Sequence, residues 1–359
     1  VVGIANSYAK IDFGLSEIVA GFIPSMVFIW FLLLSVPAAM LMNRLGRKKM
    51  VQLSNIITIV GMLLPFISYN LATCLLAFAF LGIGNTMLQV SLNPLLTNVV
   101  KGDALTSSLT AGQVVKAVSS ICGPFIAAFA AGTLGNWKYL FPIFALVTLI
   151  SAIWLMATHI EEQKSEKNAA SVASVFGLLK DKTILFLFLG IFFVVGVDVG
   201  VNTLSPKLLM ERAGWAVENA GLAASVYFFC KTAGAFIGAF ALAKVNAVKY
   251  FRWNIVIAAL ALVLLFFVDG AVPMMILIGA IGLFCASVFS IIYAAAMQAR
   301  PDKANEISGL MITGVSGGAV IPPLMGAMTD MMGGQVGSII VIGVCMLYLL
   351  WCSFRISES

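Results

Sequence analysis

Long apolar stretches, separated by short polar turns, constrain this sequence more than any other feature. A helix needs about 20 apolar residues to cross the hydrocarbon core of a bilayer. Stretches of that kind occur at 15–42, 50–68, 71–99, 104–131, 138–157, 183–210, 218–243, 253–268, 272–298, 306–329 and 336–354. Because 61% of the residues are hydrophobic and only 10% are charged, a water-soluble fold could not shield this surface. The sequence therefore predicts an all-α membrane protein.

The two halves of the chain share a pattern. Residues 39–49 and 239–252 each follow an apolar stretch, carry clustered positive charge and lead into another stretch. Gly82 in the first half has a counterpart at the same offset, Gly282. Such symmetry is typical of transporters built from two repeats with the binding site between them. It predicts two halves of six helices each.

A polar segment at residues 159–182 divides these halves. We expect an N-terminal helical half at 1–158, a linker at 159–182 with a short surface helix near Val172–Leu179, and a C-terminal half at 183–359. Residues 1–10 have the character of the end of a first helix, and we expect most of that helix to precede them. They lack the basic start of a signal peptide.

Lys and Arg are distributed unevenly between alternate turns. One set of turns holds most of them, including residues 44–49, residues 244–252 and Arg355 near the C-terminus. The opposite turns hold Lys10, Lys138, Lys207 and Arg212. Because cytoplasmic loops carry an excess of positive charge, the first set, the linker and the C-terminus are predicted to be cytoplasmic. We expect a multi-pass protein of the cell inner (plasma) membrane.

Side chains for metal or redox chemistry are sparse. The six cysteines lie within apolar stretches without metal-binding spacing, and His159 is the one histidine. We interpret the cysteines as small apolar packing residues. The phosphate-binding pattern Gly-x-x-x-x-Gly-Lys does not occur. Composition thus argues against an enzyme, a metal or other cofactor, and ATP drive, and it leaves no basic face for nucleic acid.

The basic turn at residues 43–48 reads Asn-Arg-Leu-Gly-Arg-Lys. It resembles the loop motif of the major facilitator superfamily, Gly-x-x-x-Asp-Arg-x-Gly-Arg-Arg/Lys, with Asn43 at the Asp and Ala39 at the leading Gly. The resemblance implies the major facilitator fold and a cytoplasmic gate that bonds acidic groups and helix ends. The gate residues would be Asn43, Arg44, Gly46, Arg47 and Lys48. The alternative reading is that these charges only orient the chain.

Three further passages resemble the fucose–proton symporter family of that superfamily. Residues 82–94 contain Gly-Ile-Gly-Asn and then Gln-Val-Ser-Leu-Asn-Pro, residues 113–116 read Gln-Val-Val-Lys, and residues 196–202 read Gly-Val-Asp-Val-Gly-Val-Asn. The resemblance implies import of a sugar or sugar derivative by alternating access, coupled to protons. Two positions differ from that family: Gln89 replaces a Glu that takes part in proton coupling, and Lys116 replaces a neutral Asn.

Three ionisable residues stand inside predicted spans: Lys116, Asp198 and Lys231. A charge within a membrane span is costly, so each needs a partner or a function. We predict that Asp198 pairs with Lys116 or Lys231 and that its protonation releases the lysine and couples protons to substrate. The alternative is a static salt bridge. Lys116 has a second reading, as a contact for an anionic substrate.

Amide side chains are the predicted contacts for sugar hydroxyl groups, because an amide both donates and accepts hydrogen bonds. Asn85, Gln89 and Asn93 follow one another at four-residue spacing, on one face of a helix. Gln113 and Asn202 are further candidates, and Tyr293 could stack on a sugar ring. Hydrogen bonding between helices is the alternative role for the amides.

The prediction is therefore a monomeric secondary transporter whose partners are a small-molecule sugar, a proton and the lipid bilayer. Glycines and prolines at 314–323 predict a closely packed, bendable helix in the second half. An importer of an acidic sugar or other organic anion and a drug–proton antiporter stay open as alternatives. A membrane solute sensor that binds without transporting is the alternative from another class.

Overall fold

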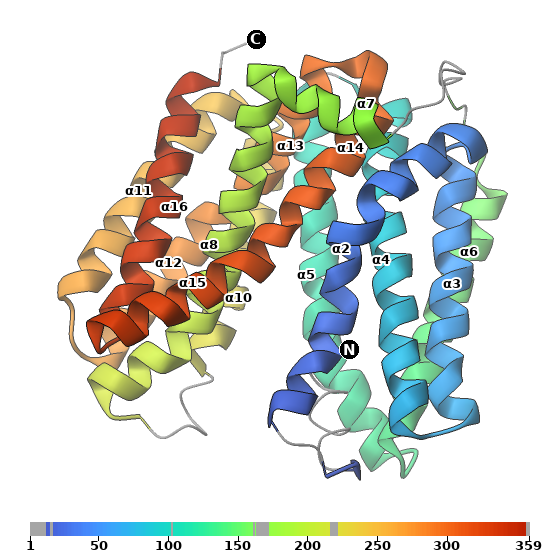
Figure 1. Cartoon of the computed structure of the whole chain (residues 1–359), viewed down its shortest axis with the longest axis horizontal. Helices are drawn as coiled ribbons and strands as arrows, with labels where there is room; N and C mark the ends of the chain where they lie inside the picture. The colour runs from blue at the N-terminus through green and yellow to red at the C-terminus, as the bar shows by residue number, and fades with distance from the viewer. Residues whose placement is uncertain are drawn as a thin grey trace. The chain divides into compact units, whose positions relative to one another are not determined.

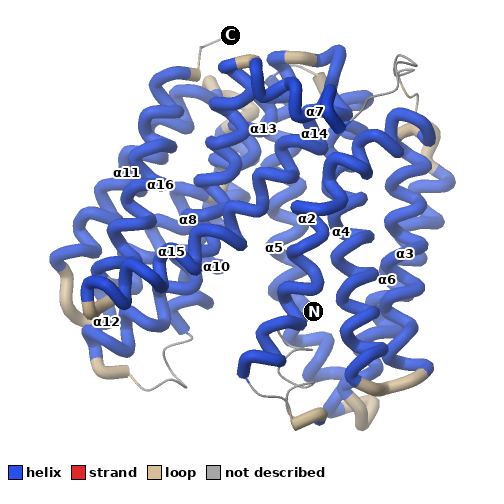
Figure 2. Tube along the Cα trace, viewed as in Figure 1, coloured by secondary structure: helices blue, strands red, loops and turns tan. Residues whose placement is uncertain are grey.

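The computed structural model describes residues 12–14, 17–101, 103–160, 162, 172–215 and 222–356. Within these ranges helices are the only regular secondary structure (Figure 2). Nine helical stretches among them are long and apolar enough to span a membrane, and α2 adds a shorter apolar stretch at Ile29–Leu45. The predicted all-α membrane architecture is confirmed.

Helices follow one another along the described part of the chain, as the colours of Figure 1 show. The α-helices are α2 (Glu17–Leu45), α3 (Arg47–Ile67), α4 (Leu71–Val99), α5 (Asp103–Gly132), α6 (Leu140–Ala157), α7 (Val172–Gly177), α8 (Lys182–Ala213), α10 (Leu222–Ala241), α11 (Ala247–Phe267), α12 (Ala271–Cys285), α13 (Val288–Ala299), α14 (Ala304–Thr313), α15 (Gly317–Met332) and α16 (Val336–Arg355). The 3₁₀ helices are η1 (Trp137–Tyr139), η2 (Leu178–Lys180), η3 (Pro301–Lys303) and η4 (Gly314–Ser316).

Three predicted spans differ in detail from the observed helices. The stretch at 272–298 is interrupted between α12 and α13, and the stretch at 306–329 is interrupted by η4. Helix α11 begins earlier than predicted, because the Asn246 side chain accepts hydrogen bonds from the backbone N–H groups of Val248 and Lys249 and so caps its first turn. The expectations for residues 1–10 and for residues 161 and 163–171 of the linker lie outside the described residues. The short helix expected near Val172–Leu179 is observed as α7 and η2.

The chain forms two compact units. Unit 1 comprises the described residues of 1–99, 118–177 and 302–313, and unit 2 comprises those of 100–117, 178–301 and 314–359. Residues 302–313 therefore pack with unit 1 although they belong to the second half of the sequence. The predicted domain boundary at 159–182 stays a prediction.

In unit 1, helices α2, α3, α4 and α6 pack side by side (Figure 1). Helix α14 joins them by contacting α2 and α4. The approach is close, because a Cβ at Gly309 would lie 2.5 Å from Ala39 Cβ and 2.9 Å from the Ser35 carbonyl oxygen. Ser308 also donates a hydrogen bond of 2.6 Å to the Val90 carbonyl oxygen. Small residues thus allow α14 to pack closely against α2 and α4 within unit 1.

Within unit 1, Asp12 connects the segment that follows α3 to the segment that precedes α6. Its Oδ2 accepts hydrogen bonds from the hydroxyl of Tyr69 at 2.7 Å and from the indole N–H of Trp137 at 3.0 Å. Burial and the bond to Asp12 raise the pKa of Tyr69 well above its ordinary value. The phenol therefore stays a donor at neutral pH.

In unit 2, helix α8 is central and contacts α10, α12, α13, α15 and α16. Glycines allow the neighbouring helices to approach one another closely. A Cβ at Gly282 of α12 would lie 2.7 Å from the Tyr227 carbonyl oxygen of α10, and a Cβ at Gly317 of α15 would collide with the backbone of Phe192 in α8. This packing fixes the rotation of α8 and α10 and so positions the charged residues that they carry.

Candidate functional site

The charged residues of α8 and α10 form an ion pair. The ammonium Nζ of Lys231 lies 2.5 Å from Oδ2 of Asp198, and about a third of each side chain is exposed. Sequence analysis left Lys116 and Lys231 as alternative partners, and the structure places Lys231 in direct contact with Asp198. Because both charges lie within helices of spanning length, the pair offsets part of the cost of placing them there.

Tyr227 is a third member of this charged group. It lies one turn before Lys231 on α10, its side chain is fully buried, and its hydroxyl donates a hydrogen bond of 2.6 Å to Oδ1 of Asp198. Each carboxylate oxygen of Asp198 therefore has a donor from α10. Two donors from one helix hold the carboxylate in a defined orientation. Sequence analysis did not single out Tyr227, although its spacing of four residues from an intramembrane lysine was a usable signal.

Lys116 belongs to the same electrostatic neighbourhood. Its segment of α5 is held to α10 by a hydrogen bond of 2.6 Å from the Ser107 hydroxyl to the Ala239 carbonyl oxygen. The charges of Lys231 and Asp198 both act on the Lys116 ammonium. Among the described residues, the group brings together the ammonium groups of Lys116 and Lys231 and the carboxylate of Asp198. Such a group suits a ligand with negative charge or with many hydrogen-bond acceptors.

Asn202 lies one turn after Asp198 on α8. Its Oδ1 atom is buried and has no hydrogen-bond partner among the described residues. Most buried polar atoms in proteins are hydrogen-bonded, so an unpaired acceptor of this kind needs an explanation. The hydroxyl group of a ligand would satisfy it.

The amide residues of α4 lie in unit 1. Asn85 and Gln89 are half-buried, and Nε2 of Gln89 donates a hydrogen bond of 3.1 Å to Oδ1 of Asn85. Asn93 lies one turn further along the same face and is also half-buried. The alignment of the three amides on one helix is as predicted, and their sugar-binding role stays a prediction.

The two remaining candidates lie in unit 2. Gln113 is a half-buried residue of α5, on the same segment as Lys116. Tyr293 is fully buried in α13, and its ring stacks on Phe289 with a centroid distance of 5.8 Å. A sugar could reach this ring only if the packing around it opened. The proposed stacking role of Tyr293 stays a prediction.

The predicted gate motif forms a hydrogen-bonded network within unit 1. Asn43 at the end of α2 donates a bond of 2.9 Å to Glu306 Oε1 and accepts one of 2.5 Å from Asn305 Nδ2, both on α14. The buried Arg47 donates 2.9 Å and 2.8 Å bonds to Asn305 Oδ1 and to the Pro94 carbonyl oxygen at the end of α4. Three helix ends are therefore connected by two residues of the motif.

The other motif residues have local roles. Gly46 precedes α3 with φ of 89°, and a Cβ there would lie 2.7 Å from Glu162 Oε2, so only glycine fits. The Glu162 carboxylate accepts hydrogen bonds from the backbone N–H groups of Arg47 and Lys48, at the positive end of α3. The Lys48 ammonium donates to the Thr158 carbonyl oxygen after α6. Arg44 is exposed, which fits a role in orienting the chain.

Asn305, Glu306 and Glu162 were missed by sequence analysis. Asn305 and Glu306 lie 258 or more residues from their partners in the motif, and no local sequence pattern predicts such a contact. Glu162 lies in the segment that follows the end of α6 at Ala157, and this segment was interpreted only as a linker.

Comparison with known proteins gives a consistent set of relatives. A Brucella abortus glucose/galactose transporter is 24% identical over 346 residues, which are 92% of this chain and 83% of the relative. An Escherichia coli fosmidomycin resistance protein is 24% identical over 261 residues, 70% of this chain and 63% of that protein. The crystal structure of an E. coli fucose:proton symporter variant superposes with a TM-score of 0.86 at 16% identity, covering 99% of this chain and 94% of the other.

The sequence profile of the Major Facilitator Superfamily matches residues 1–221, well over half of the chain. The apolar helices, the structural likeness and this match agree with one another, and the family consists of transporters rather than enzymes. The chain is a multi-pass membrane transporter that belongs to the Major Facilitator Superfamily.

Proposed function

We propose that this transporter imports a sugar or sugar derivative by alternating access, coupled to protons. The observation that carries the proposal is the Asp198–Lys231 ion pair within membrane-spanning helices, fixed by the hydrogen bond from Tyr227. Among the described residues, Asp198 is the acidic member of this group. Intramembrane acidic residues often serve in proton relays.

The coupling step follows from electrostatics. Protonation of Asp198 removes its negative charge and so weakens its attraction for the Lys231 ammonium. Lys231 is then available to donate hydrogen bonds to a substrate. When Asp198 loses its proton, it attracts the lysine again and the substrate loses that contact. Gln89, at the position of the acid that couples protons in the fucose symporter family, cannot titrate, so the coupling is assigned to Asp198.

The substrate class is inferred from the polar side chains. The amides of α4 and the unpaired Oδ1 of Asn202 suit the hydroxyl groups of a sugar. The name of the Brucella relative supports the same class. A sugar acid or another organic anion is the second candidate, because its carboxylate could accept hydrogen bonds from a lysine ammonium of this group. Because one relative is a fosmidomycin resistance protein, a drug antiporter stays an alternative. The row of amides on α4 argues against a broad apolar drug and for a polar ligand.

We further propose a monomer in the inner (plasma) membrane with the gate motif and the C-terminus in the cytoplasm. The clustered Lys and Arg at the α2–α3 and α10–α11 turns support this orientation.

The test is uptake into proteoliposomes that contain the full-length protein, under an inward proton gradient. Glucose, galactose, L-fucose and sialic acid are compared. Accumulation of a neutral sugar supports sugar symport, and accumulation of sialic acid alone moves the assignment to an anion importer. Binding without accumulation of any of them would identify a solute sensor, and neither binding nor accumulation would contradict the proposal.

A further inference from the structure

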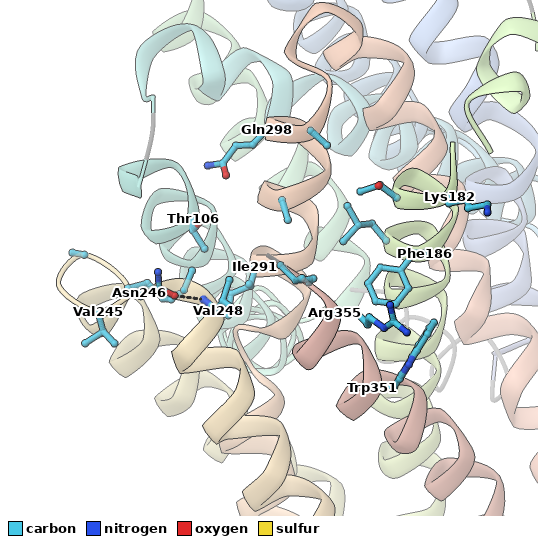
Figure 3. A pocket seen from close by; sticks show the side chains of 18 of the residues that line it. Thr106, Lys182, Phe186, Val245, Asn246, Val248, Ile291, Gln298, Trp351 and Arg355 are labelled. Atoms are coloured by element: carbon cyan, nitrogen blue, oxygen red, sulfur yellow. Dashed lines mark hydrogen bonds between the residues drawn. The ribbon is translucent and has the colours of Figure 1, made fainter. Parts of the chain in front are cut away.

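Unit 2 contains a cavity of about 940 Å³ that none of the candidate substrate-binding, ion-pair or gate residues lines. It lies where α8 and α11 begin and where α13 and α16 end, and Thr106 of α5 also contributes to it. Figure 3 shows Asn246 and Val248 on one side of it, Phe186, Trp351 and Arg355 on the other, and Ile291 between them. The cavity therefore sits at the ends of the spans, at the level where a membrane meets water.

The lining divides into an apolar floor and a polar rim. Leu187, Leu242, Val248 and Ile291 are buried and form the floor. The exposed lining residues include the three that carry charge. These are Lys182, Lys244 and Arg355. The volume suits part of an acyl chain together with a head group, and the apolar floor would gain free energy from covering it with hydrocarbon.

The charge of the lining has a single sign. Lys182, Lys244 and Arg355 are its only ionisable residues among those that the structure describes. The neighbouring carboxylate of Asp181 is engaged elsewhere, since it caps the first turn of α8 through Thr183 and pairs with Arg300 at 3.8 Å. Three cations around one opening, with no carboxylate in the lining, complement an anion.

Aromatic residues mark the same level of the membrane. Trp351 packs edge-on against Phe186 with a centroid distance of 4.9 Å, and the Arg355 guanidinium lies 5.8 Å from the Trp351 ring centre. Trp is enriched where a membrane meets water, and Arg there extends its charge toward the phosphate groups of the lipids.

We propose that this cavity binds an anionic phospholipid, with the phosphate of its head group among Lys182, Lys244 and Arg355 and an acyl chain on the apolar floor. The cations supply charge complementarity, and the bilayer supplies the ligand at this level of the protein. A zwitterionic lipid offers the same chain and phosphate, but its positive group would face the same cations. The site should therefore prefer phosphatidylglycerol to phosphatidylcholine.

The test is native mass spectrometry and thermal unfolding of the full-length protein with phosphatidylglycerol or phosphatidylcholine of identical chains. The triple variant K182Q/K244Q/R355Q should bind phosphatidylglycerol roughly 100-fold more weakly, given the usual contribution of each Lys or Arg near an anionic membrane surface. The matched control is K101Q/K180Q/K249Q, which removes three exposed charges of unit 2 that do not line the cavity. It should keep wild-type affinity and lipid preference.

A second variant tests the floor without changing any charge. Ala295 lines the cavity and is half-buried, so Ala295→Phe should fill part of it and reduce retention of phosphatidylglycerol. Full retention in this variant, equal binding of the two lipids, or equal losses in both triple variants would each overturn the proposal. Displacement of the lipid by millimolar inorganic phosphate would also overturn it, because the ligand would then be a soluble anion.

Discussion

The hydroxyl of Tyr227 donates a 2.6 Å hydrogen bond to the carboxylate of Asp198 within unit 2. Tyr227 is fully buried, and Gly282 of α12 packs against it, so the phenol has little freedom to move. Lys231, one turn further along the same helix, reaches the other carboxylate oxygen. One turn of α10 therefore sets the orientation of Asp198.

Replacement Tyr227→Phe should reduce coupled uptake, because the Asp198 carboxylate loses one of its two donors from α10. The lost hydrogen bond is worth about 1.5–3 kcal/mol for a charged acceptor. The carboxylate is then held by Lys231 and is less well oriented. The measurement is uptake in proteoliposomes across a range of pH. Tyr348→Phe is the control, since that hydroxyl donates instead to the Phe186 carbonyl oxygen, and identical profiles for the two variants would contradict the positioning role.

Replacement Asp198→Asn should abolish accumulation against a gradient while leaving exchange of labelled for unlabelled substrate. Asn is close to Asp in size and cannot exchange a proton, so the protein would equilibrate its substrate instead of concentrating it. Accumulation is measured with and without a proton gradient. Asp269→Asn, at an exposed acid, is the control and should behave as wild type. Proton-dependent accumulation by D198N would assign the coupling to another residue.

Replacement Asn202→Leu should raise KM for the substrate by roughly tenfold or more, as expected when a ligand loses a buried hydrogen bond. Thermal stability should not fall, because the native Oδ1 has no partner among the described residues to lose. The two readouts are KM and Tm on the same preparation. Thr203→Val, whose hydroxyl bonds the Val199 carbonyl oxygen, is the control and should leave KM unchanged. A lower Tm with unchanged KM would make Asn202 structural.

Replacement Asn43→Asp, which restores the superfamily motif, should destabilise this protein. Asn43 donates a hydrogen bond to the Glu306 carboxylate, and Asp would face that carboxylate with a like charge. The expected cost is about 1–3 kcal/mol, measured as a lower Tm.

The double variant Asn43→Asp with Glu306→Gln provides the matched control for this pair. Gln offers an N–H donor to the new carboxylate, so the Tm should return toward the wild-type value. If N43D alone were as stable as wild type, the hydrogen bond between Asn43 and Glu306 would not matter to this network.

Replacement Gly317→Ala should lower Tm, because its Cβ would collide with the backbone of Phe192 and force α15 away from α8. Overpacking of this kind costs about 1–3 kcal/mol. Gly326 lies in the same helix with nothing within 4 Å of a Cβ, so Gly326→Ala should be neutral or stabilising. Equal effects of the two substitutions would show that helix propensity, not packing, dominates here.

The amino-acid sequence determined the features that depend on local chemistry. Apolar length gave the helices, and four-residue spacing placed Asn85, Gln89 and Asn93 on one face of α4. Because a charge within a membrane span is costly, the sequence alone identified Lys116, Asp198 and Lys231 as residues that need a partner or a function. The residues of the gate motif were also readable, because the motif is contiguous in the sequence.

Only the tertiary structure decided which groups meet. It paired Asp198 with Lys231 and brought in Tyr227, because packing through residues such as Gly282 sets how α8 and α10 are rotated. It also placed Asn305 against Asn43, 262 residues away. A side chain's partner depends on the rotation and proximity of helices that are distant in sequence, and the period of a single helix carries no information about either.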